Sequence, residues 1–262
     1  MIILSFAYGY EKYVYDRFLF SLNKTGFKGR VILYVHKECM TYKFDDLCFG
    51  LELIEINELE NNIELKRYLY YQKVLEKEPD NQIKVFITDF RDVLFQKNPD
   101  EILFNEDLIF AQEDTSKTHI WINNCIKPAN IPDSEDKINI CSGTILGKMT
   151  SIKRFVNIYI SNFSILKNEC FGSDQALLNV LLLNGSFKDM IIKYTNNYEP
   201  LIFTMAYSKD HFKQHNYVNE SGDILNKQNE IPYIVHLYDR LLIHQKKLLN
   251  YKWKLNFVSR GK

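Results

Sequence analysis

IKVFITDFRDVLFQKNP, residues 83–99, is the stretch that decides how the rest of the chain folds. It begins with an apolar run, which predicts a buried strand, and the run ends at Asp89. Arg91 and Asp92 follow before apolar residues return at Val93. A buried strand that ends in acidic residues places their carboxylates at the carboxyl end of a sheet strand, where open α/β sheets bind ligands. We therefore predict an α/β fold with a binding site at this strand end.

The acidic cluster itself has two interpretations. Asp89 and Asp92 lie beside Arg91, and such carboxylates suit Mg²⁺ or Mn²⁺, which take one or two protein carboxylates together with phosphate oxygens and waters. The alternative is that Asp89 caps the next element while Arg91 and Asp92 form an exposed ion pair of little energetic value. Short acidic clusters are common, so residue chemistry alone leaves both interpretations open.

Composition and charge limit the classes of protein that fit. The chain has 262 residues, 46% hydrophobic and 25% charged, which is enough for one large α/β domain or two small ones. Lys plus Arg and Asp plus Glu both number 33, so a formal net charge of zero gives no bulk attraction to nucleic acid or to an acidic membrane. Much of the aromatic content, 17 Tyr and 18 Phe, must lie in the core, although Tyr-rich clefts also suit sugar rings.

The cysteines and the first residues together predict where in the cell the protein is located. The cysteines form no CxxC pair and have no histidine at metal-ligand spacing. The first segment, MIILSFAYGYEK, lacks a basic region, and its apolar run is too short for a signal peptide or a membrane span. We therefore expect a cytoplasmic protein with reduced thiols. The five cysteines are Cys39, Cys48, Cys125, Cys141 and Cys170.

The first part of the chain predicts a β-α-β unit with parallel strands. Strands are expected over residues 2–6, 30–36 and 51–56, and a helix over 11–23. The first strand runs into Phe6, Ala7 and Tyr8, and neither GxGxxG nor GxxxxGK[ST] follows it, which argues against a dinucleotide fingerprint and a P-loop. Tyr8 could stack on a nucleotide base, or it could merely cover the strand end.

The second part predicts further alternation of helices and strands. Expected elements are a helix over 64–78, a strand over 107–114, a polar loop to 132, a strand over 138–147 interrupted at Ser142 and Gly143, helices over 151–166 and 173–184, and a strand over 233–235. A glycine inside a strand often marks a bulge or a close backbone approach. We find no repeat and no domain boundary.

Three polar residues have both a structural and a functional interpretation. Arg67 could meet a phosphate or a base, although an exposed helix arginine is the commoner case. Asp174 could cap its helix, or it could point with Gln175 into a cleft. His236 follows the last predicted strand, where a lone histidine is more often structural than a metal ligand.

Taken together, these segments resemble the metal-dependent nucleotide-sugar glycosyltransferases of GT-A fold. Five motifs in the family order carry the resemblance: FAY at 6–8, TDFRDVLFQKNP at 88–99, NICSGTILG at 139–147, GSDQALLN at 172–179 and IVHLYDR at 234–240. The chain looks like small stand-alone transferases of surface-glycan pathways in bacteria and large DNA viruses, and more distantly like glycogenin and bacterial galactosyltransferases. The resemblance implies one GT-A-like domain over residues 1–262, with a mostly parallel central sheet flanked by helices.

The resemblance also implies a metal site. In this family an acidic motif after the fourth strand binds Mn²⁺ or Mg²⁺ and, through it, the donor diphosphate, and a late histidine completes the metal shell. Asp89 would be the first acid of the DxD motif and His236 the late histidine. The third motif position is Arg91 instead of an acid, so Asp92 would supply the carboxylate, or Arg91 would contact the diphosphate itself. The segment GSDQALLN is similar to the family's DQD-type helix start, with Ala176 in place of the second acid.

The implied activity is transfer of a sugar from a nucleotide-diphosphate donor, with UDP favoured, to a hydroxyl of a glycan acceptor, with retention favoured. An inverting enzyme would need a base such as Asp174 or Glu113. A catalytically inactive binding module is the alternative, as is a sugar nucleotidyltransferase, although the latter needs a Gly-rich basic loop that AYGYEK lacks. The candidates are Asp174 and Gln175 for catalysis, Asp89, Asp92 and His236 for the metal, and Phe6, Ala7, Tyr8, Arg67, Asp89, Phe90, Arg91, Ser142 and Gly143 for the donor.

The final segment, HQKKLLNYKWKLNFVSRGK at 244–262, is basic and contains Trp253 and Phe257. It could contact an acidic membrane or a lipid-linked acceptor. The alternative is a helix that packs against the sheet.

Overall fold

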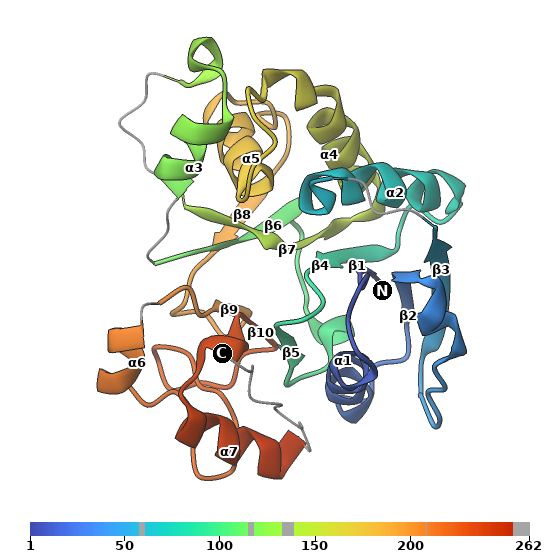
Figure 1. The fold of residues 1–262 in the computed structure, drawn as a ribbon, viewed down its shortest axis with the longest axis vertical. Helices are drawn as coiled ribbons and strands as arrows, with labels where there is room; N and C mark the ends of the chain where they lie inside the picture. Colours follow the sequence, from blue (N-terminus) through green and yellow to red (C-terminus); the bar gives the residue numbers. More distant parts are fainter. Residues whose placement is uncertain (58–60, 115–117, 133–138, 208, 254–262) are drawn as a thin grey trace.

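The computed structural model describes residues 1–57, 61–114, 118–132, 139–207 and 209–253. A seven-stranded sheet with the order β3-β2-β1-β4-β7-β6-β8 lies at its centre (Figure 1). Its strands in chain order are β1 (Ile2–Phe6), β2 (Arg30–His36), β3 (Gly50–Ile56), β4 (Lys84–Thr88), β6 (Leu108–Gln112), β7 (Ile140–Lys148) and β8 (Ile192–Thr195). Only the two pairings made by β7, with β4 and with β6, are antiparallel among these strands. The predicted mostly parallel α/β sheet is confirmed.

Helices cover both faces of this sheet because successive strand residues point to opposite sides. Ile2 and Leu4 pack into a core with α2 (Ile63–Lys77), α4 (Met149–Ser161) and α5 (Ser173–Leu183). Ile3, between them, packs into a second core with α1 (Lys12–Lys24). The short helix α3 (Thr118–Cys125) lies beside α5 (Figure 1).

A second, three-stranded sheet stands next to the first, with the order β5-β10-β9. Its strands are β5 (Val93–Phe95), β9 (Ile202–Thr204) and β10 (Ile234–His236). Strand β5 follows β4 after a four-residue turn, so the chain passes directly from the large sheet to the small one. Strand β10 pairs with β5 in antiparallel register, with His236 opposite Val93. This pairing brings the end of the chain to the turn that carries the acidic cluster.

The remaining helices complete the lower part of Figure 1. They are α6 (Lys209–Gln214) and α7 (Ile243–Trp253). Elsewhere in the chain lie the 3₁₀ turns η1 (Lys37–Thr41), η2 (Pro99–Glu101), η3 (Pro128–Asn130), η4 (Phe163–Ile165) and η5 (Tyr238–Arg240). Leu249 and Trp253 of α7 are buried in a third core with Phe203 and Val235 of the small sheet. The expected packing of this helix against a sheet is therefore observed, although Phe257 lies outside the described residues. No helix among the described residues is long and apolar enough to cross a membrane.

Several sequence predictions were wrong in their local detail. Helix α3 occupies part of the segment predicted as a polar loop. Strand β7 continues through Gly143, but its register with β6 shifts between Ile140 and Ile145, so an irregularity is observed around Ser142 and Gly143 as predicted. Ile138, the predicted start of this strand, lies outside the described residues. The cysteines are not all reduced, because Cys125 and Cys170 form a disulfide. That bond ties α3 to the loop before α5, and the free thiols are Cys39, Cys48 and Cys141.

Candidate metal and donor site

Three potential metal ligands meet where the two sheets join. Asp89 directly follows β4, Asp92 directly precedes β5, and His236 ends β10. Backbone hydrogen bonds hold the turn from both sides, since the amide of Asp89 donates to the carbonyl of Gly143 at 2.8 Å and the amide of Leu237 donates to the carbonyl of Asp92 at 2.8 Å. Because main-chain pairing positions all three, their side chains converge without help from a mobile loop.

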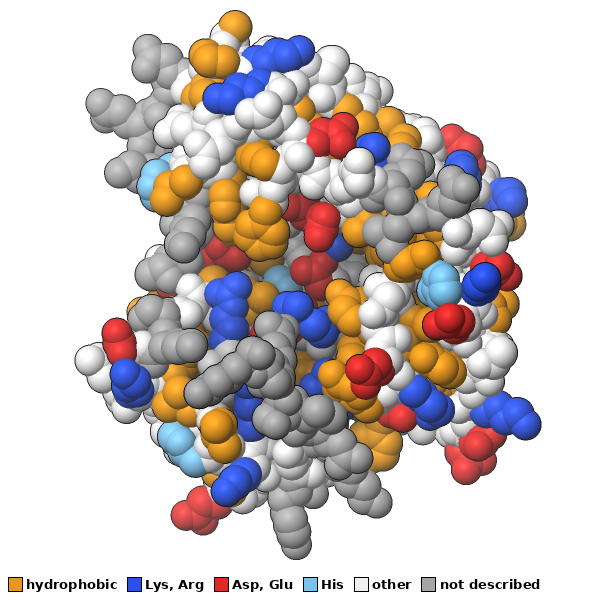
Figure 2. Space-filling view, in the orientation of Figure 1, with side chains coloured by type: hydrophobic (Ala, Val, Ile, Leu, Met, Phe, Trp, Pro, Cys, Tyr) orange, Lys and Arg blue, Asp and Glu red, His pale blue; other side chains and the backbone are white. Residues whose placement is uncertain are grey.

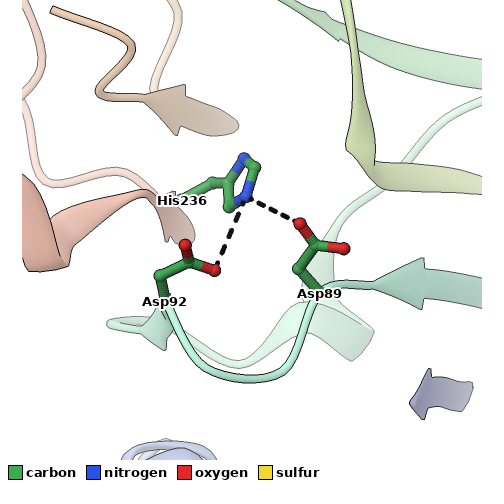
Figure 3. Close-up of side chains that lie close together, drawn as sticks. All are labelled: Asp89, Asp92 and His236. Carbon is green, nitrogen blue, oxygen red and sulfur yellow. Dashed lines mark ion pairs between the residues drawn. The ribbon is translucent and has the colours of Figure 1, made fainter. Parts of the chain in front are cut away.

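The side chains of Asp89, Asp92 and His236, which we call the metal triad, point toward one another (Figure 3). The Nε2 atom of His236 lies 3.4 Å from Oδ2 of Asp89 and 3.8 Å from Oδ1 of Asp92. One ligand atom from each residue lies within 4.8 Å of the others. His236 is only 2% exposed, and its Nε2 makes no well-formed hydrogen bond within the described structure. A buried nitrogen without a hydrogen bond, facing two carboxylates, fits a divalent cation such as Mn²⁺ or Mg²⁺.

The charges of the metal triad support this interpretation. Burial raises the pKa of Asp92, and the neighbouring carboxylates of Asp89 and Asp239 raise it further. Burial alone would lower the pKa of His236, but the Cys141 thiol and the two aspartates raise it above its usual value. Without a cation, the imidazolium is thus a counter-charge that the two carboxylates share, in addition to Arg67 beside Asp89 and Arg91 beside Asp92. A bound divalent cation would supply that positive charge and take Nε2 as a ligand.

A contact that the sequence did not predict orients the histidine. The Sγ atom of Cys141 lies 3.3 Å from Nδ1 of His236, and both residues are buried. Ligating histidines usually make such a contact through their second ring nitrogen, which sets the orientation of the ring. Burial raises the pKa of the Cys141 thiol to about 11, so it remains protonated near neutral pH.

Gly143 explains how the metal triad fits against the large sheet. A Cβ atom at Gly143 would lie 2.4 Å from Cε1 of His236 and 2.6 Å from Oδ2 of Asp89. Any side chain at this position would therefore occupy the space of the two ligands. The glycine within a strand marks a close approach, which is one of the two meanings expected for it.

Arg67 is buried and belongs to the site, so the interpretation as an exposed helix residue was wrong. It projects from α2 and donates from Nη1 to Asp89 and from Nη2 to the carbonyl of Ser142 at 3.2 Å and to Asp174 at 3.5 Å. The hydroxyl of Ser142 also donates to Asp174 at 2.8 Å. We call these four residues, Arg67, Asp89, Ser142 and Asp174, the Arg67 cluster.

The pKa values of the two acids in the Arg67 cluster move in opposite directions. Partial burial would raise the pKa of Asp89, but Arg67 holds it well below its usual value. Burial raises the pKa of Asp174, and the attraction of Arg67 and the hydrogen bond from Ser142 oppose this only in part. Asp89 is therefore firmly ionised. Its second oxygen, Oδ2, faces Nε2 of His236 in the metal triad.

The first turn of α5 carries the two predicted catalytic residues, Asp174 and Gln175, next to the Arg67 cluster. Gly172, at φ +83°, occupies the N-cap position, so Asp174 lies in the first turn and does not cap the helix. The Nε2 atom of Gln175 donates to Oε2 of Glu113 at 3.1 Å, next to the end of β6. Burial raises the pKa of Glu113. Figure 2 shows a hollow at the centre of this face, with acidic side chains and a histidine at its floor.

The predicted donor residues divide into those that face the site and those that do not. Phe6 stacks on Tyr34 with ring centroids 6.0 Å apart, and Tyr8 meets His36 edge to face at 5.1 Å, so both rings line the carboxyl ends of β1 and β2. The side chain of Ala7 is fully buried. Phe90 is also buried, with its ring 4.7 Å from that of Phe18 in the second core, which leaves only its backbone for a ligand.

Arg91 is 40% exposed at the turn between the two sheets, and its Nη2 atom lies 2.9 Å from Asp92 and 3.6 Å from Asp239. The interpretation of Arg91 and Asp92 as an exposed ion pair is therefore half right, since Asp92 is only 4% exposed. Asp239 was not singled out from the sequence, although it lies within the motif IVHLYDR. The arginine at the third motif position neutralises part of the charge of two carboxylates.

Comparison with known proteins identifies the fold. No protein-family model and no curated protein sequence matches the chain. The structure is similar to the crystal structure of the galactosyltransferase LgtC in complex with donor and acceptor sugar analogues, with a TM-score of 0.57. The similarity covers 99% of this chain and 98% of that one at 13% sequence identity. The chain thus has the GT-A type of fold that the sequence motifs predicted.

Proposed function

We propose that this protein is a glycosyltransferase that moves a sugar from a nucleoside-diphosphate donor to a hydroxyl of a glycan acceptor, with UDP as the favoured nucleotide. The observation that carries the proposal is the metal triad, in which the buried Nε2 of His236 faces two carboxylates at the carboxyl end of β4. Open α/β sheets bind ligands at that edge. The similar galactosyltransferase was solved with donor and acceptor sugar analogues, which supports sugar transfer by this fold.

Each side chain of the metal triad is oriented by one neighbour and keeps one further oxygen or nitrogen atom that could bind a cation. Asp89 is held by Arg67, Asp92 by Arg91 and His236 by Cys141. Mn²⁺ or Mg²⁺ held by these three residues would neutralise negative charge on the departing diphosphate. Ligands that are already oriented lose little conformational entropy when they bind a cation.

The chain also supplies its own positive charge for the diphosphate. Departure of the nucleotide builds negative charge on the phosphates, and a cation placed there in advance stabilises the transition state. Arg91 is half exposed beside the metal triad, and its planar guanidinium suits bidentate contacts with phosphate oxygens. Arg67, in contrast, is buried and both of its Nη atoms donate within the protein, so we assign it a positioning role for Asp89 and Asp174.

We favour retention of the anomeric configuration. An inverting transferase needs a carboxylate that is available to deprotonate the acceptor hydroxyl. Asp174 is paired with Arg67 and accepts a hydrogen bond from Ser142, and Glu113 accepts one from Gln175. Asp174 and Gln175 then serve to position the donor sugar and the acceptor. Proton NMR of the product anomer decides between retention and inversion.

The direct test is thermal stability against nucleotides and nucleotide sugars with Mn²⁺, with Mg²⁺ and with EDTA. Ligands that bind the folded state increase the free energy of unfolding, by about 2.7 kcal/mol at a concentration 100 times Kd, and thereby raise the melting temperature. We expect a UDP-sugar to raise it only when metal is present. His236→Asn should remove the effect, whereas His244→Asn, an exposed histidine of α7, should keep it.

Turnover separates an enzyme from a binding module. Incubation of a stabilising nucleotide sugar with Mn²⁺ should release the nucleoside diphosphate, slowly into water and faster with an oligosaccharide acceptor. A stabilising shift without release would support the inactive module of the same fold. A shift that survives EDTA would transfer the diphosphate role to Arg91, and no shift with any nucleotide would contradict the proposal.

A further inference from the structure

Away from the metal triad, one surface groove has the dimensions of a ligand site. It lies between α3 and the loop that leads into α5, and its volume is about 590 Å³. Sites for small molecules typically measure about 300–1,000 Å³. It is lined by Ile120, Trp121, Asn124, Lys167, Asn168, Cys170 and Phe171, and Nδ2 of Asn168 donates to the carbonyl of Asn124 at 3.2 Å, which leaves its amide oxygen for a ligand.

The groove exposes large apolar side chains beside Trp121, which itself packs in part against the first core. Phe171 is 81% exposed and Ile120 is 43% exposed, which is unusual for large apolar side chains. The rings of Trp121 and Phe171 lie 5.9 Å apart at 85°, so they form an apolar corner. Gly172 supports the indole from behind, because a Cβ atom there would lie 2.4 Å from Cδ2 of Trp121.

The groove is also rigid. Its two walls are joined by the Cys125–Cys170 disulfide and by a hydrogen bond of 2.8 Å from the amide of Lys167 to the carbonyl of Cys125. The ammonium group of Lys167 donates to the carbonyl of Asn123 at 3.1 Å. A surface that is held in place before binding loses little entropy on binding. The cross-links between the two walls should therefore favour binding of a ligand against the exposed ring of Phe171.

The groove lies close to the proposed active site along the chain. Phe171 precedes Asp174 by three residues, and three residues span at most about 11 Å between Cα atoms. Asp174 and Gln175 are buried in the first turn of α5, where they contact Arg67 and Glu113. Figure 2 shows hydrophobic side chains gathered at the rim of the hollow, on the part of the surface over α3 and α5.

We infer that this groove is a subsite for the acceptor glycan, which holds a neutral sugar ring a few units away from the hydroxyl that receives the transferred sugar. The inference rests on the proposed function. Sugar rings present C–H faces that pack on aromatic rings, and their hydroxyls pair with amides. Trp121 and Phe171 supply the rings, and Asn124 and Asn168 supply the amides at the edge of the groove.

Other occupants fit the groove less well. A stable protein partner buries about 800 Å² on each side, which is far more than a groove lined by seven residues offers. Attachment to an anionic membrane uses clusters of Lys and Arg, about 1 kcal/mol for each. Among the residues that the structure describes, Lys167 is the one cation that lines the groove, and it donates to the carbonyl of Asn123.

The two tryptophans of the chain provide a specific assay. Trp253 is buried and donates from Nε1 to the carbonyl of Gly222 at 3.0 Å, whereas Trp121 lines the groove. In the Trp253→Phe variant, tryptophan emission reports Trp121 alone. We expect saturable changes in this emission on titration with maltohexaose, cellohexaose or chitohexaose, with EDTA present. In that background, Phe171→Ala should weaken binding about tenfold, and Phe20→Ala, a partly exposed phenylalanine of α1, should leave it unchanged.

The transfer assay then tests the link to activity. Phe171→Ala should raise KM for a hexasaccharide acceptor about tenfold and leave KM for the nucleotide sugar unchanged. A nucleotide-sugar shift without any emission change on oligosaccharide addition overturns the subsite and leaves the proposed function intact. An emission change without any nucleotide-sugar shift upholds a glycan site and overturns the transferase. A response to phosphatidylglycerol vesicles alone, or self-association lost in Phe171→Ala, overturns the glycan assignment.

Discussion

Asp89 belongs to two charge clusters, the Arg67 cluster toward α2 and the metal triad toward β10. In the Arg67 cluster, the arginine contacts both acids and the hydroxyl of Ser142 donates to Asp174, so each acid has a donor from within the cluster. In the metal triad, Nε2 of His236 lacks a well-formed hydrogen bond within the described structure, and the pKa of Asp92 is raised. The Arg67 cluster also keeps one buried nitrogen, Nε of Arg67, without a hydrogen bond to any described residue, and the pKa of Asp174 is also raised. The two clusters differ in that both acids of the Arg67 cluster accept hydrogen bonds from its own members, whereas Nε2 of His236 faces Asp89 and Asp92 without a well-formed hydrogen bond to either.

The difference separates residues that build the site from residues that await a ligand. A buried charge without a partner is costly, and folded proteins keep such groups mainly where function requires them. We therefore expect changes in the Arg67 cluster to reduce the stability of the metal-free protein. Changes in the metal triad should instead reduce binding and turnover, with little effect on stability.

The largest effect is expected for Arg67→Met. The change leaves Asp89 and Asp174 without their shared cation, and removal of one partner from a buried ion pair typically costs about 3–5 kcal/mol. Arg154→Met is the matched control, because its pair with Asp189 is exposed and should be worth less than about 1 kcal/mol. Urea denaturation without metal measures both values. Equal losses in the two variants would contradict a structural role for the Arg67 cluster.

Asp92→Asn should have the opposite profile. It keeps the shape of the side chain and removes a carboxylate whose raised pKa indicates that the fold disfavours its charge. We expect the stability without metal to stay the same or to rise, while Mn²⁺ no longer stabilises the protein and turnover falls by about 100-fold. Asp239→Asn, which also removes a partner of Arg91, should retain the Mn²⁺ effect. Loss of stability in Asp92→Asn with unchanged metal binding would show that Asp92 stabilises the fold and does not bind the metal.

Gly143→Ala tests the point at which the two clusters meet. The added Cβ atom would push His236 and Asp89 apart, and overpacking typically costs about 1–3 kcal/mol. We expect about tenfold weaker Mn²⁺ binding, measured by titration of the melting temperature. Gly50→Ala is the control, since its nearest neighbour would be 3.7 Å away. Unchanged Mn²⁺ affinity in Gly143→Ala would show that the triad does not depend on this close approach.

The Arg67 cluster was harder to predict from the sequence than the metal triad. Strands β1 and β2 were predicted with their observed bounds, because short apolar runs with turn residues on both sides carry a strong local signal. Asp89 was likewise placed at a strand end by the apolar run before it. The burial of Arg67, however, depends on partners from three other elements. No local pattern around Arg67 contains that information.

The other errors have similar physical causes. Helix α3 reads THIWINNC, and its β-branched and Asn residues are weak helix formers, so its packing on α5 stabilises it. The cysteines that form the disulfide are 45 residues apart, and their pairing depends on how α3 meets the loop before α5. The pairing of β5 with β10 joins residues about 140 positions apart, and it was not predicted; the family resemblance implied only that His236 would join Asp89 at a metal.

Asp114 lies in a second cluster in which a carboxylate is held by several partners from the protein. We expect its removal to have a small effect on the free energy of unfolding. Its carboxylate accepts hydrogen bonds from Asn197 at 3.2 Å and Tyr207 at 2.6 Å, and it pairs with Lys227 at 2.5 Å. Burial would raise the pKa of Asp114, but these three partners lower it below its usual value.

A depressed pKa contributes stability that is complete above the unfolded value of about 3.9 and disappears as the pH falls through the folded value. The difference in unfolding free energy between wild type and Asp114→Asn should therefore shrink as the pH falls from 6 to below 3. Because the carboxylate is partly exposed, we expect less than about 1 kcal/mol. Urea denaturation across this range measures the difference, and a constant difference would place its origin in packing and not in charge. Lys227→Met should flatten the same dependence, because it removes the cation that lowers the pKa of Asp114.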